Sequence, residues 1–138
     1  MDRMKRLAAT AALGAGVALT ASVVTATAAQ AAYTPTQICG SSYQVVESQP
    51  LGSNGEARVY WLNNGVSNCI VTLKQGSAIG NSVKVSATLK TGSATKVDGP
   101  AAFQYYAGPV KADNPGGACV SYGGTYGSST YTSPASCG

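Results

Sequence analysis

Four widely spaced cysteines follow an apolar leader, and they constrain the fold more than any other feature of this 138-residue chain. An even number of cysteines in a small exported chain indicates a disulfide framework, because the extracellular compartment is oxidising. Four cysteines allow three pairings, and we favour the one that joins sequence neighbours, with separations of 30 and 18 residues. In the chain-entropy model, loops of this length each stabilise a fold by roughly 3–4 kcal/mol. The expected disulfides are Cys39–Cys69 and Cys119–Cys137.

A metal cluster is the alternative use of these cysteines. Zinc sites usually contain cysteine pairs with about two to four residues between them. Here the closest two cysteines are 18 residues apart. We therefore expect no metal site, and a domain that depends on its disulfides because a core of this size leaves a narrow margin of stability.

The leader has the three parts of a secretory signal. Cations cluster in Met1–Arg6, an apolar stretch covers Leu7–Val24, and Ala29-Gln30-Ala31 offers the small residues that a signal peptidase reads. We expect cleavage after Ala31, with Ala32 as the near alternative. A retained membrane helix is the other interpretation, since the apolar stretch is just long enough to span a bilayer. The favoured organisation is a signal peptide over residues 1–31 and one domain over residues 32–138, with no transmembrane segment after cleavage.

The charge of the exported part excludes several classes of function. The chain has no histidine, which removes histidine triads, histidine bases and histidine metal ligands together. After the leader, six Lys or Arg face four Asp or Glu, so the net charge falls from +4 to +2 and no basic run remains. Nucleic-acid binding needs a concentrated basic face, and we expect none.

Catalytic groups are also few. There is no G-x-S-x-G motif, phosphate-binding loop or dinucleotide fingerprint. A Ser–Lys pair stays open as a weak alternative, and a glycosidase would need two carboxyl groups flanking the scissile bond. Glu56 and Asp98 lie beside glycine in turn-like segments, where solvated carboxylates are ordinary. We expect no enzyme, no catalytic residue and no cofactor; the four acids available are Glu47, Glu56, Asp98 and Asp113.

Apolar residues after the leader recur with the period of two that is typical of a half-buried strand. The alternation is clean over residues 83–90 and less clean over residues 68–74. Further strands are predicted over residues 43–46, 58–62, 103–107 and 119–122, and turns over residues 52–55, 63–65, 98–100 and 114–117. We expect helix only as a turn near residues 34–38 and an irregular tail over residues 123–138. The predicted fold is all-β, a small antiparallel β-sandwich or barrel with two disulfides.

Ten aromatic residues, all in the exported part, are the candidates for contact with a ligand. Sugar-binding modules stack sugars on exposed rings, but large rings are more often part of a core. Tyr60 and Trp61 are adjacent in a predicted strand and therefore point to opposite faces. The favoured interpretation is a structural role for most rings. The candidate ligand-contacting aromatics are Trp61, Tyr105, Tyr106 and Tyr122.

An ordered set of short segments spans the whole exported part. They are Cys39-Gly40 followed by Tyr43–Val46, then Asn68–Lys74, Tyr105–Val110, Ala118–Gly124 and Ser136–Gly138. In this order and spacing they resemble the spore-associated protein A family of spore-forming filamentous actinobacteria. A tryptophan often stands in that family where this chain has Tyr122, which is a conservative departure.

The resemblance implies a protein of the spore or aerial-hypha surface, with spore-surface or cell-wall components as partners. It implies no catalytic residue. The leading hypothesis is therefore a secreted, non-catalytic spore- or cell-surface protein, extracellular in location. The alternative is an extracellular binding module for a cell-wall polysaccharide or for a protein, including inhibition of a protease.

Overall fold

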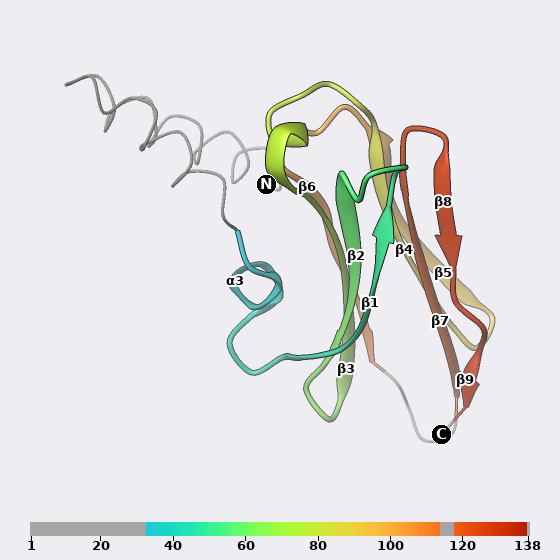
Figure 1. Ribbon diagram of the computed structural model, residues 1–138. Coiled ribbons are helices and arrows are strands. Elements are labelled where there is room, and N and C mark those ends of the chain that lie inside the picture. Colours follow the sequence, from blue (N-terminus) through green and yellow to red (C-terminus); the bar gives the residue numbers. More distant parts are fainter. Residues whose placement is uncertain (1–32, 114–117, 138) are drawn as a thin grey trace.

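The computed structural model describes residues 33–113 and 118–137, and it is an antiparallel β-sandwich (Figure 1). One sheet has the strand order β1-β2-β3-β6, and the other has the order β5-β4-β7-β8, with β9 also paired to β7. The all-β fold expected from the sequence is confirmed. In chain order the elements are α3 (Pro35–Cys39), β1 (Gln44–Leu51), β2 (Ala57–Asn63), β3 (Ser67–Lys74), the 3₁₀ turn η1 (Gly76–Ala78), β4 (Val85–Thr91), β5 (Ala94–Ala101), β6 (Tyr106–Asp113), β7 (Cys119–Tyr126), β8 (Ser129–Thr132) and β9 (Ser136–Cys137).

The main core lies between the two sheets. On β4 the alternation predicted from the sequence is confirmed, because Val85, Ala87 and Leu89 all point inward and are buried. Gly124 of β7 also faces inward, and a Cβ there would lie only 2.5 Å from Oγ1 of Thr72 on the other sheet. The sheets therefore approach closely at this point. The buried cluster between them is Leu51, Ala57, Val59, Ile70, Val85, Ala87, Leu89, Ala107, Val110, Val120 and Tyr122.

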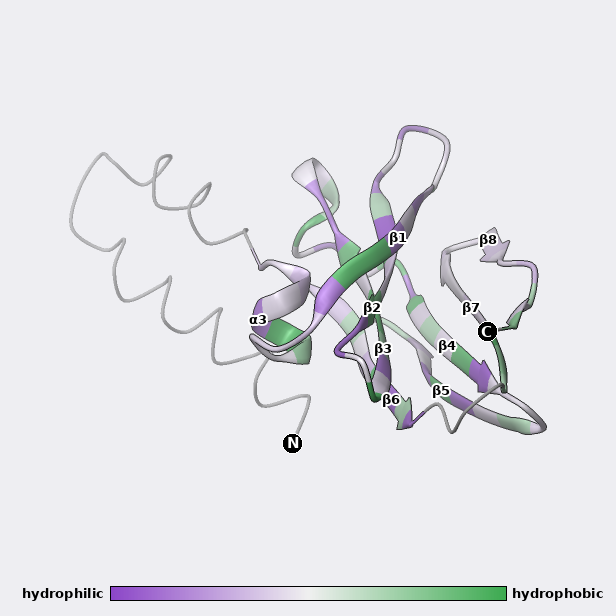
Figure 2. Ribbon diagram, turned by 90° about the horizontal axis from the view of Figure 1, so that it is seen from below, coloured by the Kyte–Doolittle hydropathy of each residue, from purple (hydrophilic) through white to green (hydrophobic). Residues whose placement is uncertain are grey.

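A second apolar cluster covers the outer face of the β1-β2-β3-β6 sheet, where α3 packs. Consequently β3 is buried on both faces: Ile70 faces the main core, while Val71 and Leu73 face the second cluster. Ile70 interrupts the alternation in the sequence because its face of β3 is also buried, although the other residues on that face are polar, namely Asn68, Thr72 and Lys74. Buried apolar side chains are therefore concentrated around β3. The strand β1 has an apolar stretch as well (Figure 2), but its Val45 and Val46 are exposed.

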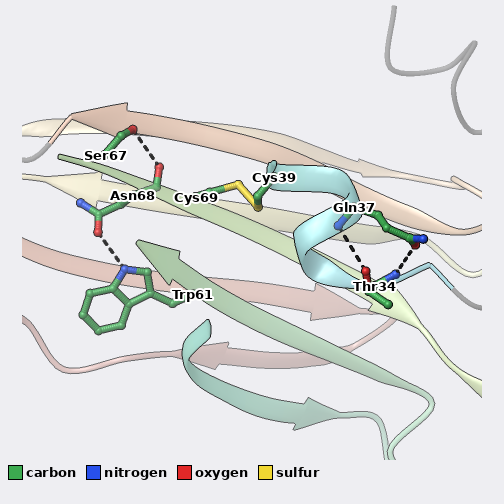
Figure 3. Close-up of a disulfide and its surroundings, with 7 residues drawn as sticks. All are labelled: Thr34, Gln37, Cys39, Trp61, Ser67, Asn68 and Cys69. Carbon is green, nitrogen blue, oxygen red and sulfur yellow. Dashed lines mark hydrogen bonds between the residues drawn. A yellow bond between two sulfur atoms is a disulfide. The ribbon is translucent and has the colours of Figure 1, made fainter. Parts of the chain in front are cut away.

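The short helix α3 forms where a helical turn was expected. Thr34 caps it by accepting a hydrogen bond from the Gln37 backbone N–H, while the Gln37 side chain accepts one from the Thr34 N–H. This reciprocal capping satisfies two backbone donors that a five-residue helix would otherwise leave open. The Cys39–Cys69 disulfide then attaches the helix to β3 (Figure 3). The structure also contains the Cys119–Cys137 disulfide, so its two bridges are those favoured from the sequence.

Three expectations drawn from the sequence were wrong. A strand was predicted over residues 103–107, but residues 103–105 precede β6, which begins at Tyr106. Residues 123–138 were expected to be irregular, but β7 continues to Tyr126 and is followed by β8 and β9. The predicted turn at residues 98–100 lies inside β5, where Gly99 and Pro100 form a bulge opposite Ser86. The hairpin turn at residues 63–65 is confirmed between β2 and β3. The leader, its cleavage site and the turn predicted at residues 114–117 lie outside the described residues.

Candidate functional site

The structure brings two of the four candidate aromatics together and adds a third ring to them. Trp61 on β2 and Tyr122 on β7 both face the space between the sheets, with ring centroids 5.7 Å apart. The ring centroid of Tyr131 on β8 also lies 5.7 Å from that of Tyr122. Tyr122 is 1% exposed, whereas Trp61 and Tyr131 are half-buried. These three rings, which we call the aromatic row, therefore present only their two outer members to solvent.

The other two candidates belong to a separate cluster. Tyr105 and Tyr106 are buried under α3 and pack against Tyr33, whose ring centroid lies 6.0 Å and 5.1 Å from theirs. Burial, and secondarily the neighbouring Tyr105, raises the pKa of the Tyr33 phenol. These rings hold the helix on the sheet, and they do not join Trp61 in one exposed surface.

Glu47 stands beside the aromatic row. The buried Tyr122 hydroxyl donates a 2.7 Å hydrogen bond to Oε1 of Glu47, which is otherwise exposed. Burial raises the pKa of Tyr122, and the bond to Glu47 raises it further, so the phenol remains a hydrogen-bond donor at any physiological pH. The row thus has a carboxylate at its solvent side.

A bulge in β1 places Glu47 at this position. Val45 pairs with Leu62 and Glu47 pairs with Trp61, so Val46 is the extra residue on β1. The bulge sets Glu47 opposite an inward-facing residue. Its role could not have been found from the sequence, because nothing in the local pattern marks the bulge.

Trp61 forms a hydrogen bond to the buried side-chain amide of Asn68. Its indole Nε1–H donates a 2.8 Å hydrogen bond to Oδ1 of Asn68 on β3 (Figure 3). The Asn63 amide donates a second 2.8 Å bond to the same oxygen. Asn68 is fully buried, and its Nδ2 has no hydrogen-bond partner among the described residues. The indole is therefore fixed in one orientation by an asparagine that the sequence did not single out.

A shallow hollow of about 150 Å³ lies on the β4-β7-β8 sheet. In the strand register Thr88, Gly123 and Thr132 form one row across it, with Lys90 opposite Ser121 beside them. Gly123 has no side chain because the β8 backbone lies there: a Cβ would clash with the Tyr131 carbonyl oxygen. Most of the exposed lining is apolar, and its polar part consists of hydroxyl groups and one ammonium with no carboxylate. Such a mixed surface suits a sugar, which has both apolar ring faces and hydroxyl groups. This surface was missed in the sequence because its residues come from three strands.

Other chemistry is limited within the described residues. No group of three or more Cys, Asp or Glu side chains is placed to hold a metal ion in residues 33–113 and 118–137. Over the same ranges, no helix has the length and hydropathy needed to cross a bilayer.

Comparison with known proteins places the chain in a family. No family model matches it, and no solved structure does. Spore-associated protein A of Streptomyces coelicolor is 34% identical to it over 122 residues, which make up 88% of this chain and 77% of that protein. The match confirms the resemblance found in the sequence. The chain belongs to the spore-associated protein A family.

Proposed function

We propose that this protein is exported and associates with the spore or aerial-hypha surface, where it has no catalytic role. The observation that carries the proposal is the likeness to spore-associated protein A over 88% of the chain. Two disulfides support it, because such bonds form and persist in oxidising extracellular environments. The leader supports export by its composition.

The carboxylates support a non-catalytic role. Glu47 accepts the Tyr122 hydroxyl, Glu56 accepts the Asn54 backbone N–H at 3.0 Å, and Asp98 accepts the Gly108 backbone N–H at 2.7 Å. Each of these acids thus stabilises local structure.

Fractionation of the native host tests this proposal. Spores, vegetative mycelium and culture fluid would be separated, washed in buffer of increasing salt and probed with an antibody. We expect the protein in the spore fraction after low-salt washes, with an intact mass that begins at Ala32 or Tyr33. A protein found only in the culture fluid would contradict surface association, and a mass that includes Met1 would contradict cleavage.

The hydroxyl-lined hollow favours a second candidate function, the binding of a cell-wall polysaccharide. Pull-down on chitin, cellulose and peptidoglycan tests it. Thr88→Val and Thr132→Val remove two lining hydroxyls and preserve β-branched side chains. Thr95→Val is the matched control, because Thr95 lies on the same sheet, opposite Lys90, but does not line the hollow. Saturable binding that is lost in the first two variants and kept in the control would support this function; binding unchanged in all three would exclude the hollow.

A further inference from the structure

The two disulfides differ sharply in their access to solvent. Cys39 is 2% exposed and Cys69 is 0% exposed, because the helix α3 and the second apolar cluster cover them. Cys119 and Cys137 are both exposed. A thiolate can break a disulfide only by reaching one of its sulfur atoms, so solvent access decides which bond exchanges first. In this protein that bond is Cys119–Cys137.

Opening this bond would remove its contribution to stability but would release only the strand pairing of β9. The strand β9 has two residues and pairs only with β7, through Cys119 with Cys137 and Val120 with Ser136. By contrast, Cys119 sits in an eight-residue strand that also pairs with β4, and its carbonyl accepts the Gly92 N–H at 3.0 Å. Cys137 can therefore move away while Cys119 stays in place.

A clamp just before β9 limits how far such an opening would spread. The Ser133 N–H donates a 2.8 Å hydrogen bond to the Tyr122 carbonyl, and the Tyr122 N–H donates a 3.0 Å bond to Oγ of Ser133. These two bonds anchor the chain beyond β8 without the disulfide. Only residues 134–137 depend on the disulfide and on β9 for their position.

We propose that the Cys119–Cys137 disulfide is a thiol–disulfide exchange site, through which the protein becomes linked covalently to a cysteine of another protein at the cell surface. The partner's thiolate attacks one of the two sulfurs and forms a mixed disulfide with it. The Cys119–Cys137 bond breaks, and the other cysteine leaves as a thiolate that takes a proton from water. One disulfide and one thiol are consumed and one of each is formed, so no external oxidant or reductant is needed.

This inference goes beyond surface association, because it assigns a bond rather than a location. If no exchange occurs, the protein can still be held at the surface by non-covalent contacts. Conversely, exchange with a thiol in solution does not require the protein to reach a spore. The covalent link at the surface rests on the proposed surface association, whereas exchange with a thiol in solution does not, so the two experiments below distinguish a failure of exchange from a failure of association.

Reduced glutathione is the probe for the first experiment. The folded, secreted protein would be incubated with increasing glutathione without denaturant, quenched with an alkylating reagent and mapped by peptide mass spectrometry. We expect glutathione or alkyl adducts on Cys119 and Cys137 at least about tenfold faster than on Cys39 and Cys69. The buried pair in the same molecule is the control. Equal rates for the two pairs, or faster labelling of Cys39 and Cys69, would overturn the proposal.

The second experiment examines the link in the native host. Wall and spore extracts, prepared with an alkylating reagent to block exchange after lysis, would be run on gels with and without reductant. We expect a species of higher mass that collapses to the free protein on reduction and is absent from a strain that carries Cys119→Ser/Cys137→Ser. Circular dichroism would show that the double variant remains folded, as the Ser133 clamp implies. Absence of the heavier species from wild-type extracts, or its persistence in the variant, would overturn a covalent link through this pair.

Discussion

The carboxylate of Asp98 accepts a 2.7 Å hydrogen bond from the backbone N–H of Gly108, and this bond joins the two sheets at one edge. Asp98 lies on β5 and Gly108 on β6, which are the edge strands of different sheets. Each residue adjoins a bulge, since Gly99-Pro100 interrupts the pairing of β5 and Gly108-Pro109 that of β6. The two irregular segments therefore face each other and share one charged acceptor.

Loss of this acceptor is expected to destabilise the sandwich. Asp98→Ala removes this hydrogen bond to the Gly108 N–H and should lower the free energy of unfolding by about 1.5–3 kcal/mol, the usual range for a hydrogen bond to a charged group. Asp98→Asn keeps a neutral acceptor and should lose less. Urea unfolding followed by circular dichroism measures both. Asp113→Asn, at an exposed position on β6, is the matched control and should be nearly neutral.

Gly124 is expected to tolerate no larger residue. An added Cβ would lie 2.5 Å from Oγ1 of Thr72, 3.0 Å from the Ser86 carbonyl and 3.1 Å from a Val59 methyl. Gly124→Ala should therefore cost about 1–3 kcal/mol of stability through overpacking. Chemical denaturation provides the measurement, and an unchanged midpoint would show that the sheets can separate at this point at no cost.

A double-mutant cycle identifies Thr72 as the group that is crowded. Thr72→Ala alone removes its 2.8 Å hydrogen bond to the Ser86 carbonyl, which joins the sheets inside the core, and should cost about 1–3 kcal/mol. Combined with Gly124→Ala, it also removes the nearest atom from the new methyl. We expect the double variant to lose less stability than the sum of the single losses. Strict additivity would place the clash elsewhere.

The parts of this fold that depend on local sequence patterns could be predicted from the sequence. The alternation around Val85, Ala87 and Leu89 predicted a half-buried strand, and the Asn64-Gly65 pair predicted a hairpin; both are present. The prediction of a turn beside Asp98 was wrong because Gly-Pro is an ordinary turn signal. Only the pairing of β5 with β4 shows that the chain continues there as a strand. The strand β8 was not predicted because its four residues are mostly polar and are too few to show an alternating pattern.

The candidate site was less predictable than the fold. Trp61 and Tyr122 could be proposed as aromatics, but their partners could not, since Glu47 depends on a bulge and Tyr131 on a strand that the sequence did not predict. Tyr105 and Tyr106 were candidates by type alone, and their burial depends on where α3 packs. Long-range register decides such positions, and a single sequence does not display it.

Glu47 should control the ionisation of Tyr122. Burial is the largest cause of the raised pKa of Tyr122, and the hydrogen bond from its hydroxyl to Glu47 is the next. In Glu47→Gln the acceptor becomes neutral, so the pKa of Tyr122 should fall while remaining above that of an exposed tyrosine. A spectrophotometric tyrosine titration at alkaline pH measures this change. Glu56→Gln is the control, because the Glu56 carboxylate accepts a backbone N–H of its own loop instead. A titration curve identical in Glu47→Gln and wild type would contradict the coupling.

Lys74 should make the stability of the sandwich depend on alkaline pH. Its side chain is 3% exposed, and Nζ donates hydrogen bonds to the carbonyls of Asn81 and Phe103 at 2.7 and 2.6 Å. Burial lowers its pKa from 10.5 to about 8. Between these two values the unfolded chain binds more protons at this site than the folded protein does, so the contribution of Lys74 to the free energy of unfolding rises with pH. Below about pH 8 Lys74 is charged in both the folded and unfolded chains, so burial of its ammonium lowers the free energy of unfolding by its full amount.

Comparison with Lys74→Met isolates this effect. Methionine preserves the apolar length of the side chain but cannot titrate, so the difference in unfolding free energy between wild type and variant should shift in favour of wild type as pH rises from about 8 toward 10. The raised pKa of Tyr122 acts in the opposite direction at higher pH, since the folded phenol retains a proton that the unfolded one loses, but it is common to both proteins and cancels in the difference. Urea unfolding at intervals across this range provides the measurement. A difference that does not change with pH would mean that Lys74 titrates alike in the folded and unfolded chains, despite its burial against two carbonyl groups.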